Sequence, residues 1–139
     1  MYIIYPQSNG QLAVISPCGT LEEAKKDIPA GVSYKIVNSV DIDNYFFDAY
    51  EFDETHGTKI NTSKAKEIQL NKFREARIPL LQQLDVEFMR AIEQQNTDQQ
   101  QKIIEQKQAL RDVTKIMLPE SPNHIKKMWP KILGPANKQ

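Results

Sequence analysis

One long stretch of this chain lacks almost all of the residues that interrupt helices. Between Thr62 and Leu118 there is no glycine and a single proline, while Gln, Glu, Lys, Leu and Ala are abundant. The abundant residues are good helix formers, whereas glycine costs about 1 kcal/mol and proline about 3 kcal/mol in a helix interior. The sequence therefore predicts that this half of the chain is helical.

Apolar residues recur three or four positions apart in this stretch and predict two amphipathic helices. The first stripe consists of Phe73, Ala76, Leu80, Leu84, Phe88 and Ala91, and it is widened by Leu81, Met89 and Ile92. The second stripe consists of Ile103, Leu110, Val113 and Met117, with Ile104 beside it. Stripes of this width face a core or a partner, so we expect the two helices to pack together.

The connection between the two helices is short and polar, at residues 94–98. Thr97 and Gln100 have the spacing of a capping box, which predicts that the second helix begins near Asp98. A short connection between amphipathic helices makes them antiparallel neighbours. Pro79 lies within the first helix and predicts either a kink there or the start of a separate helix.

The charged residues beside the apolar stripes predict a register for this hairpin. If the turn centres near Asn96, Asp85 lies across from Lys107, and Leu81 lies across from Arg111. Partly buried ion pairs add little net stability but disfavour wrong registers and wrong partners. We therefore interpret the block KQALRDVT (107–114) as structural, with charges that align two helices, rather than as part of a catalytic site.

A third helical segment follows near the C-terminus. Leu118-Pro119 ends the second long helix, Ser121-Pro122 is typical of a helix start, and Pro130 ends the segment just after Trp129. Side chains from all three helices form the predicted interface, as cross-helix packing or as a surface for partners. Its residues are Phe73, Leu80, Leu81, Leu84, Asp85, Phe88, Met89, Ile92, Ile103, Lys107, Leu110, Arg111, Val113 and Trp129.

The N-terminal half has the alternating and turn-rich pattern of a small sheet. The runs YIIY and LAVI flank Asn9-Gly10, a dipeptide typical of hairpin turns. Residues 20–23 (TLEE) form a capping box, which predicts a short helix through Asp27. Residues 32–37 alternate as a half-buried third strand, with Val32, Tyr34 and Ile36 on one face. Aromatic residues within 46–52 favour a fourth strand.

The sequence thus predicts an α+β protein, with a small N-terminal antiparallel sheet and one short helix, a long antiparallel helical hairpin and a short C-terminal helix. The predicted boundaries are 1–53 for the α+β domain, 54–61 for a linker, 62–133 for the helical part and 134–139 for a flexible tail. The linker prediction rests on the polar, non-periodic sequence DETHGTKIN at 53–61.

The composition argues against several function classes. Eighteen basic residues balance eighteen acidic ones, whereas nucleic-acid binders usually carry a basic excess. The apolar runs are too short for a membrane-spanning helix, and the single Cys18 cannot form an internal disulfide, which favours a reducing compartment. We therefore expect neither nucleic acid nor a membrane as a partner.

No motif in the sequence requires an enzyme, a metal or a cofactor. His56 and His124 lack the spacing of metal ligands, and no histidine stands beside Cys18 to activate it. The acidic residues between Asp41 and Glu54 could bind a cation or a basic partner. They lack the glycine and the terminal glutamate of a calcium loop, so a solvated edge around the fourth strand is favoured.

Four blocks of the sequence resemble a family of small proteins encoded by tailed bacteriophages and prophages, near tail and virion structural genes. They are DIPAGVSYKIV (27–37), LQQLDVEFMRAIE (81–93), KQALRDVT (107–114) and MWPKIL (128–133). The C-terminal half is also similar in pattern to phage tail-fibre assembly proteins. Arg77, Leu80, Leu81 and Asp85, then residues 109–112, then Trp129-Pro130 occupy the places of that pattern. The chain departs from it in its N-terminal hairpin and in Pro79.

This resemblance implies a protein that acts by binding other phage tail or tail-fibre proteins, and copies of itself. Its expected location is the virion tail, after assembly in the host cytoplasm. Two other roles stay open, namely a tail-fibre assembly chaperone that is absent from the mature particle and a host-directed regulatory binding protein. A small hydrolase built around Cys18 or the acidic segment is the remaining alternative.

Overall fold

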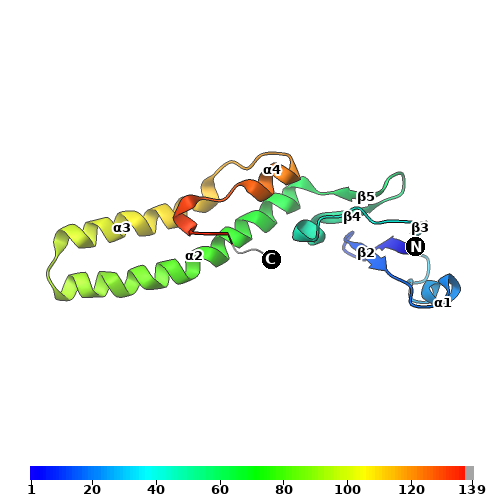
Figure 1. Cartoon of the computed structure of the whole chain (residues 1–139), viewed down its shortest axis with the longest axis horizontal. Helices are drawn as coiled ribbons and strands as arrows, with labels where there is room; N and C mark the ends of the chain where they lie inside the picture. The colour runs from blue at the N-terminus through cyan, green and yellow to red at the C-terminus, as the bar shows by residue number, and fades with distance from the viewer. Residues whose placement is uncertain (137–139) are drawn as a thin grey trace. The chain divides into compact units, whose positions relative to one another are not determined.

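The computed structural model describes residues 1–136 and has the α+β fold that the sequence predicts (Figure 1). The chain forms two compact units, Met1–Ala65 and a second unit that begins at Lys66. The boundary lies inside the first turns of the long helix α2 (Thr62–Glu93). The first unit contains all the strands, and the second contains the helical hairpin and the C-terminal segment.

A three-stranded antiparallel sheet with the order β2-β1-β3 forms the first part of unit 1. Strands β1 (Tyr2–Pro6) and β2 (Leu12–Ile15) form the predicted hairpin. Gly10 has a φ of 84°, a conformation that glycine adopts without steric cost. The side chain of Asn9 accepts a 3.0 Å hydrogen bond from the backbone N–H of Gln11 and so stabilises the turn.

The third strand differs from its prediction in length and in the face that it buries. Strand β3 (Lys35–Val37) has only three residues and pairs with β1 along one edge of the sheet. Tyr34 and Ile36 are exposed rather than buried. Alternation along a strand fixes which residues share a face, but whether that face is covered depends on what packs against it.

The segment predicted as one strand over 46–52 is a 3-10 helix followed by a strand. The helix η1 (Asn44–Ala49) is capped by Asp43, whose side chain accepts a hydrogen bond from the backbone N–H of Tyr45. Phe46 and Ala49 are fully buried. The aromatic residues here therefore serve packing rather than a strand, because burial overrides a local propensity.

Half of the predicted linker at 54–61 is a strand of a second sheet. Strand β4 (Tyr50–Asp53) pairs antiparallel with β5 (Gly57–Ile60). Asp53 stabilises the turn between them, since its Oδ1 accepts a 2.8 Å hydrogen bond from the backbone N–H of Thr55. A polar turn and a short polar strand therefore produced the sequence pattern that resembles a linker.

The short helix α1 (Leu21–Lys25) begins with the predicted capping box. The Thr20 hydroxyl accepts from the backbone N–H of Glu23, and the Glu23 carboxylate accepts from the backbone N–H of Thr20. The helix ends two residues before the predicted Asp27. The buried core of unit 1 consists of Ile3, Ile4, Leu12, Ala24, Phe46, Ala49 and Ala65.

Helices α2 and α3 (Thr97–Asp112) form the predicted antiparallel hairpin (Figure 1). Helix α2 is continuous over 32 residues and contains Pro79, so no separate helix begins there. Asn96, rather than Thr97, caps α3 by accepting a 3.0 Å hydrogen bond from the backbone N–H of Gln99. Asn is at least as good a cap as Thr, and Thr97 is already the first helical residue.

The C-terminal segment contacts α2 between Lys66 and Phe73. It begins with the 3-10 helix η2 (Val113–Lys115), continues through α4 (Pro122–Lys127), which starts at Ser121-Pro122 as predicted, and reaches the 3-10 helix η3 (Lys131–Leu133). Trp129 donates a 2.8 Å hydrogen bond from Nε1 to the carbonyl oxygen of Gly134, within the predicted tail at 134–139. Residues 137–139 of that tail lie outside the described residues.

Candidate interaction surface

The inward face of α2 packs against α3 and the C-terminal segment. Phe73, Ile103 and Ile125 are fully buried, and Ala91, Leu110, Val113, Leu118 and Leu133 are nearly so. Phe73 meets Trp129 edge to face, with ring centroids 5.3 Å apart. Burial of these side chains supplies most of the driving force that holds unit 2 together.

An ion pair joins the two long helices at the predicted place. Lys107 Nζ contacts Asp85 Oδ1, which confirms the predicted register of these two residues. The lysine also lies 5.8 Å from the centre of the Phe88 ring, within cation–π range. The Asp85 side chain is 60% exposed, and exposed pairs contribute about 0.2–1 kcal/mol. The pair therefore aligns the helices more than it stabilises them.

Arg77 makes a second cross-helix contact, one that sequence reasoning missed. Its guanidinium donates to the carbonyl oxygen of Arg111 at 3.1 Å and to that of Leu110 at 3.5 Å. Carbonyl groups at the end of a helix lack partners within the helix, so Arg77 satisfies the C-terminal end of α3. The sequence did contain a signal for this contact. Arg77 lies one helical turn before Leu81, and the predicted register places Leu81 across from Arg111.

The remaining charges of the KQALRDVT block act within their own helix. The Asp112 carboxylate forms an ion pair with Lys115 at 3.0 Å and accepts a 3.0 Å hydrogen bond from the side-chain amide of Gln108. The Lys115 ammonium, followed by the Gln108 amide, lowers the pKa of the Asp112 carboxyl below its ordinary value. The Arg111 side chain is exposed and forms no ion pair within residues 1–136. The cross-helix contact at Arg111 is therefore made by its backbone carbonyl, which Arg77 binds, and not by its side chain.

A buried glutamine fastens the C-terminal segment to α2. Gln69 has no exposed surface, and its Nε2 donates a 2.8 Å hydrogen bond to the carbonyl oxygen of Met128. A buried amide costs free energy unless it is hydrogen-bonded. Lys66 pairs with Glu120 nearby at 2.5 Å. Together with the ring contact between Phe73 and Trp129, these bonds fix the backbone of a segment that has little regular structure.

The outward face of α2 carries a second row of apolar side chains. Ile78, Val86, Met89 and Ile92 are 53%, 49%, 58% and 46% exposed. At about 100° per residue, these four lie within an arc of about 120° whose centre is opposite Phe73 and Ala91. No described side chain covers them. Sequence reasoning placed Met89 and Ile92 in the packed apolar stripe. It missed Ile78 and Val86, although a helical projection places both of them outside that stripe.

The structure divides the predicted interface into three groups of residues. The buried group consists of Phe73, Ile103, Leu110 and Val113. The partly buried group consists of Leu80, Leu81, Leu84, Phe88, Lys107 and Trp129. The exposed group consists of Asp85, Met89, Ile92 and Arg111. The first two groups hold unit 2 together, and only the exposed residues are available to another molecule.

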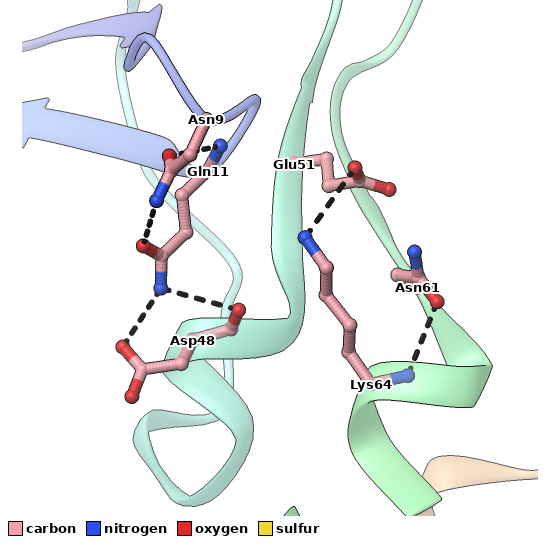
Figure 2. Close-up of polar contacts among 6 residues, drawn as sticks. All are labelled: Asn9, Gln11, Asp48, Glu51, Asn61 and Lys64. Atoms are coloured by element: carbon pink, nitrogen blue, oxygen red, sulfur yellow. Dashed lines mark hydrogen bonds and ion pairs between the residues drawn. The ribbon is translucent and has the colours of Figure 1, made fainter. Parts of the chain in front are cut away.

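The acidic segment of unit 1 uses most of its carboxylates for internal contacts (Figure 2). Asp48 accepts a 3.0 Å hydrogen bond from the side chain of Gln11, which is itself bonded to Asn9. Glu51 pairs with Lys64 at 3.9 Å, in the first turn of α2. No group of side chains that could hold a metal ion occurs among residues 1–136. The geometry supports a structural role for these carboxylates.

Within unit 1, the structure does not bring the candidate chemical residues Cys18 and His56 together. Cys18 is exposed and lines a shallow depression of 260 Å³ with residues 15–17, 19, 20, 23, 24 and 27, none of which is a histidine. His56 lies 3.5 Å from Asp53 at the β4–β5 turn, whereas His124 belongs to α4. Within unit 1, no histidine lines the depression beside the Cys18 thiol.

Comparisons with known proteins do not assign the chain to a family. No family model, curated protein or solved structure matches the sequence or the fold. Across residues 1–136, no helix is both long enough and apolar enough to cross a bilayer. The outward face of α2 is therefore the feature from which a function can be inferred.

Proposed function

We propose that this protein is a bacteriophage tail or tail-fibre-associated structural or assembly protein that acts by protein–protein binding. Its docking surface is the outward face of α2, formed by Ile78, Val86, Met89 and Ile92. The phage assignment is supported by the four sequence blocks that resemble proteins encoded beside tail genes. The binding mode is supported by the hairpin, which presents a rigid helix face to a partner.

The single observation that carries the binding proposal is the uncovered apolar row on α2. Each of its four side chains is about half exposed, and burial of apolar area stabilises a complex by about 25 cal/mol per Å². Isolated apolar residues on a surface are ordinary, but four exposed apolar side chains within one arc of a helix favour an interaction site. An amphipathic partner helix could cover such a row, as in helix-in-groove recognition.

Two related roles use the same surface at different times. A structural subunit keeps its partner and remains in the mature particle, whereas a tail-fibre assembly chaperone releases the fibre protein before the particle is complete. A host-directed regulator would bind a bacterial protein instead. The exposed methionine in the row fits any of these roles, because flexible methionine side chains adapt to different partners.

Quantitative mass spectrometry of purified phage particles tests the proposed location. A structural subunit is expected at many copies per particle. Absence from particles, together with copurification with newly made fibre protein, would support the chaperone role. Absence from both, together with capture of a bacterial protein, would support the regulator and contradict the tail assignment.

A second experiment tests the binding face. The double substitution Ile78→Gln and Met89→Gln should leave the circular dichroism spectrum and the melting temperature unchanged and should abolish copurification of the phage partner. Ile104→Gln on α3 is the matched control, because Ile104 is 48% exposed but belongs to another helix. Equal loss of binding in the control would show that the surface is not confined to α2.

A further inference from the structure

The zero net charge of this chain conceals a strong separation of charge along the sequence. Residues 36–58 contain six carboxylates and neither lysine nor arginine. Residues 113–136 contain four lysines and a single carboxylate, Glu120. The Glu120 carboxylate is already paired with Lys66. Residues 36–58 are therefore an acidic segment, bounded by Lys35 and Lys59, and the C-terminal segment is basic.

The basic surface combines free lysines with exposed apolar side chains. Lys127 and Lys131 are exposed and form no ion pair with any of residues 1–136. Met128 and Ile132 alternate with them at the end of α4 and in η3, and both are exposed. We refer to Lys127, Met128, Lys131 and Ile132 as the basic segment. Its composition suits an acidic partner surface that also offers apolar contact.

The acidic surface of unit 1 has the complementary composition. Asp41 and Glu54 are exposed and, unlike the other four carboxylates, have no partner within residues 1–136. Tyr34 and Ile36 are exposed on and beside the edge strand β3. Lys35 donates a 3.4 Å hydrogen bond to the carbonyl oxygen of Thr55, which places the Glu54 turn next to β3. We refer to Tyr34, Ile36, Asp41 and Glu54 as the acidic edge.

We propose that the basic segment of one copy of this protein docks on the acidic edge of a second copy. The two surfaces differ, so the contact is heterologous, and repeated contacts close into a ring or continue as a filament. The inference deepens the proposed function by naming a second copy as one partner. It concerns a different surface from the outward face of α2, so the two proposals can fail separately.

Charge and composition favour a second copy over nucleic acid. Proteins that bind DNA tightly neutralise about six to ten phosphates, whereas the basic segment offers two free lysines and no arginine. Arginine is the residue that recognises phosphate groups in a bidentate manner. The apolar residues between the lysines require a partner with apolar surface, and the acidic edge supplies both properties in equal stoichiometry within the same chain.

Sedimentation velocity of the full-length protein tests the proposal. At an ionic strength of about 20 mM the wild type should form species larger than a monomer, and at about 500 mM it should dissociate, because salt screens exposed charges. The variant K127E/K131E and the variant D41K/E54K should each remain monomeric at low salt. Either charge reversal should raise the dissociation constant of self-association by roughly tenfold or more, because it removes a few exposed charge contacts.

A mixture of the two variants gives the decisive result. K127E/K131E carries negative charge at both surfaces and D41K/E54K carries positive charge at both, so each surface of one variant complements the other surface of its partner. An equal mixture should therefore form alternating hetero-oligomers, although each variant alone stays monomeric. Combining all four substitutions in one chain should restore self-association. The control variant R90E/K102E changes the net charge by the same amount on the hairpin and should associate like the wild type.

Several results would overturn the proposal. These are a wild type that is monomeric at low salt, a K127E/K131E variant that associates like the wild type, or a mixture that stays monomeric. The proposal would also be overturned if a monomeric wild type bound a DNA duplex or anionic vesicles through Lys127 and Lys131. If self-association fails while the double substitution of Ile78 and Met89 still abolishes phage-partner binding, the proposed function stands without this contact.

Discussion

Both faces of helix α2 carry large apolar side chains, but these side chains have different environments. The inward face presents Phe73 and Ala91, which α3 and the C-terminal segment bury almost completely, whereas the outward face leaves Met89 and Ile78 more than half exposed. For these apolar residues the difference in exposure lies in the number of neighbours that pack against them. A hairpin with one C-terminal segment can cover one side of a 32-residue helix, so the second side is left for another molecule.

This comparison separates residues that keep the protein folded from residues that are free to bind. On the inward face, cavity formation makes a large side chain costly to remove. On the outward face, removal of a side chain changes little in the isolated protein. Substitutions of equal size on the two faces should therefore have opposite consequences for stability and for partner binding, and each prediction below tests that contrast.

The largest expected effect is that of Phe73→Ala on the inward face. The substitution leaves a cavity beside Trp129 and should lower the free energy of unfolding by about 3–5 kcal/mol. Met89→Ala is the outward counterpart and should change it by less than about 0.5 kcal/mol. Urea denaturation followed by circular dichroism measures both. A large cost for Met89→Ala would mean that the outward face is covered in the isolated protein.

A carboxylate introduced on either face gives a second contrast. Leu84→Asp places an unpaired charge in the partly buried face and should cost about 3 kcal/mol, because a desolvated charge without a partner is unfavourable. Val86→Asp, two residues away on the outward face, should melt like the wild type but bind its partner poorly. If Leu84→Asp assembles and melts like the parent, Leu84 does not belong to the packed face.

The ion pair at the border between the two faces should contribute less. A double-mutant cycle with Asp85→Asn and Lys107→Met isolates its coupling energy, which we expect to be below about 1 kcal/mol and to decrease with added salt. The pair should matter more for the register of the hairpin than for its stability. A coupling energy of several kcal/mol would indicate that Asp85 is desolvated when the protein folds.

The smallest effect concerns the pKa of the Asp112 carboxyl, which contacts with Lys115 and Gln108 lower from its ordinary value of 3.8. A group whose pKa is depressed by folding stabilises the protein fully above its unfolded pKa, and the stabilisation is lost as the pH falls through the folded value. The contribution should thus be constant at neutral pH and disappear below about pH 4. Carbon-detected NMR titration should show the pKa rising in Lys115→Ala.

Much of the fold follows from local chemistry, and the sequence predicts those parts correctly. The Asn9-Gly10 turn, the Thr20–Glu23 capping box and the Ser121-Pro122 helix start each depend on a few adjacent residues. The register that joins Asp85 to Lys107 was also predictable, because a short turn near Asn96 leaves little freedom for an antiparallel hairpin. The errors fall where packing overrides local preference, as at Phe46, which lies in a buried 3-10 helix.

The candidate surface was only partly predictable. Periodicity placed Met89 and Ile92 in one broad apolar stripe with Phe73, since both faces of α2 contain large apolar residues. Only the position of α3 and of the C-terminal segment decides which face is buried. The same holds for Gln69, whose sequence neighbours give no sign that it hydrogen-bonds to the backbone of Met128, 59 residues away.

The sequence by itself determined the helical hairpin, its turn and the separation of acidic from basic residues, because spacing, capping and charge are written into adjacent positions. The tertiary structure alone decided that Gln69 is buried and that four apolar side chains of α2 remain exposed. Those outcomes depend on contacts between residues far apart in the chain. Burial is a property of neighbours in space, and neighbours in space exist only once the chain has folded.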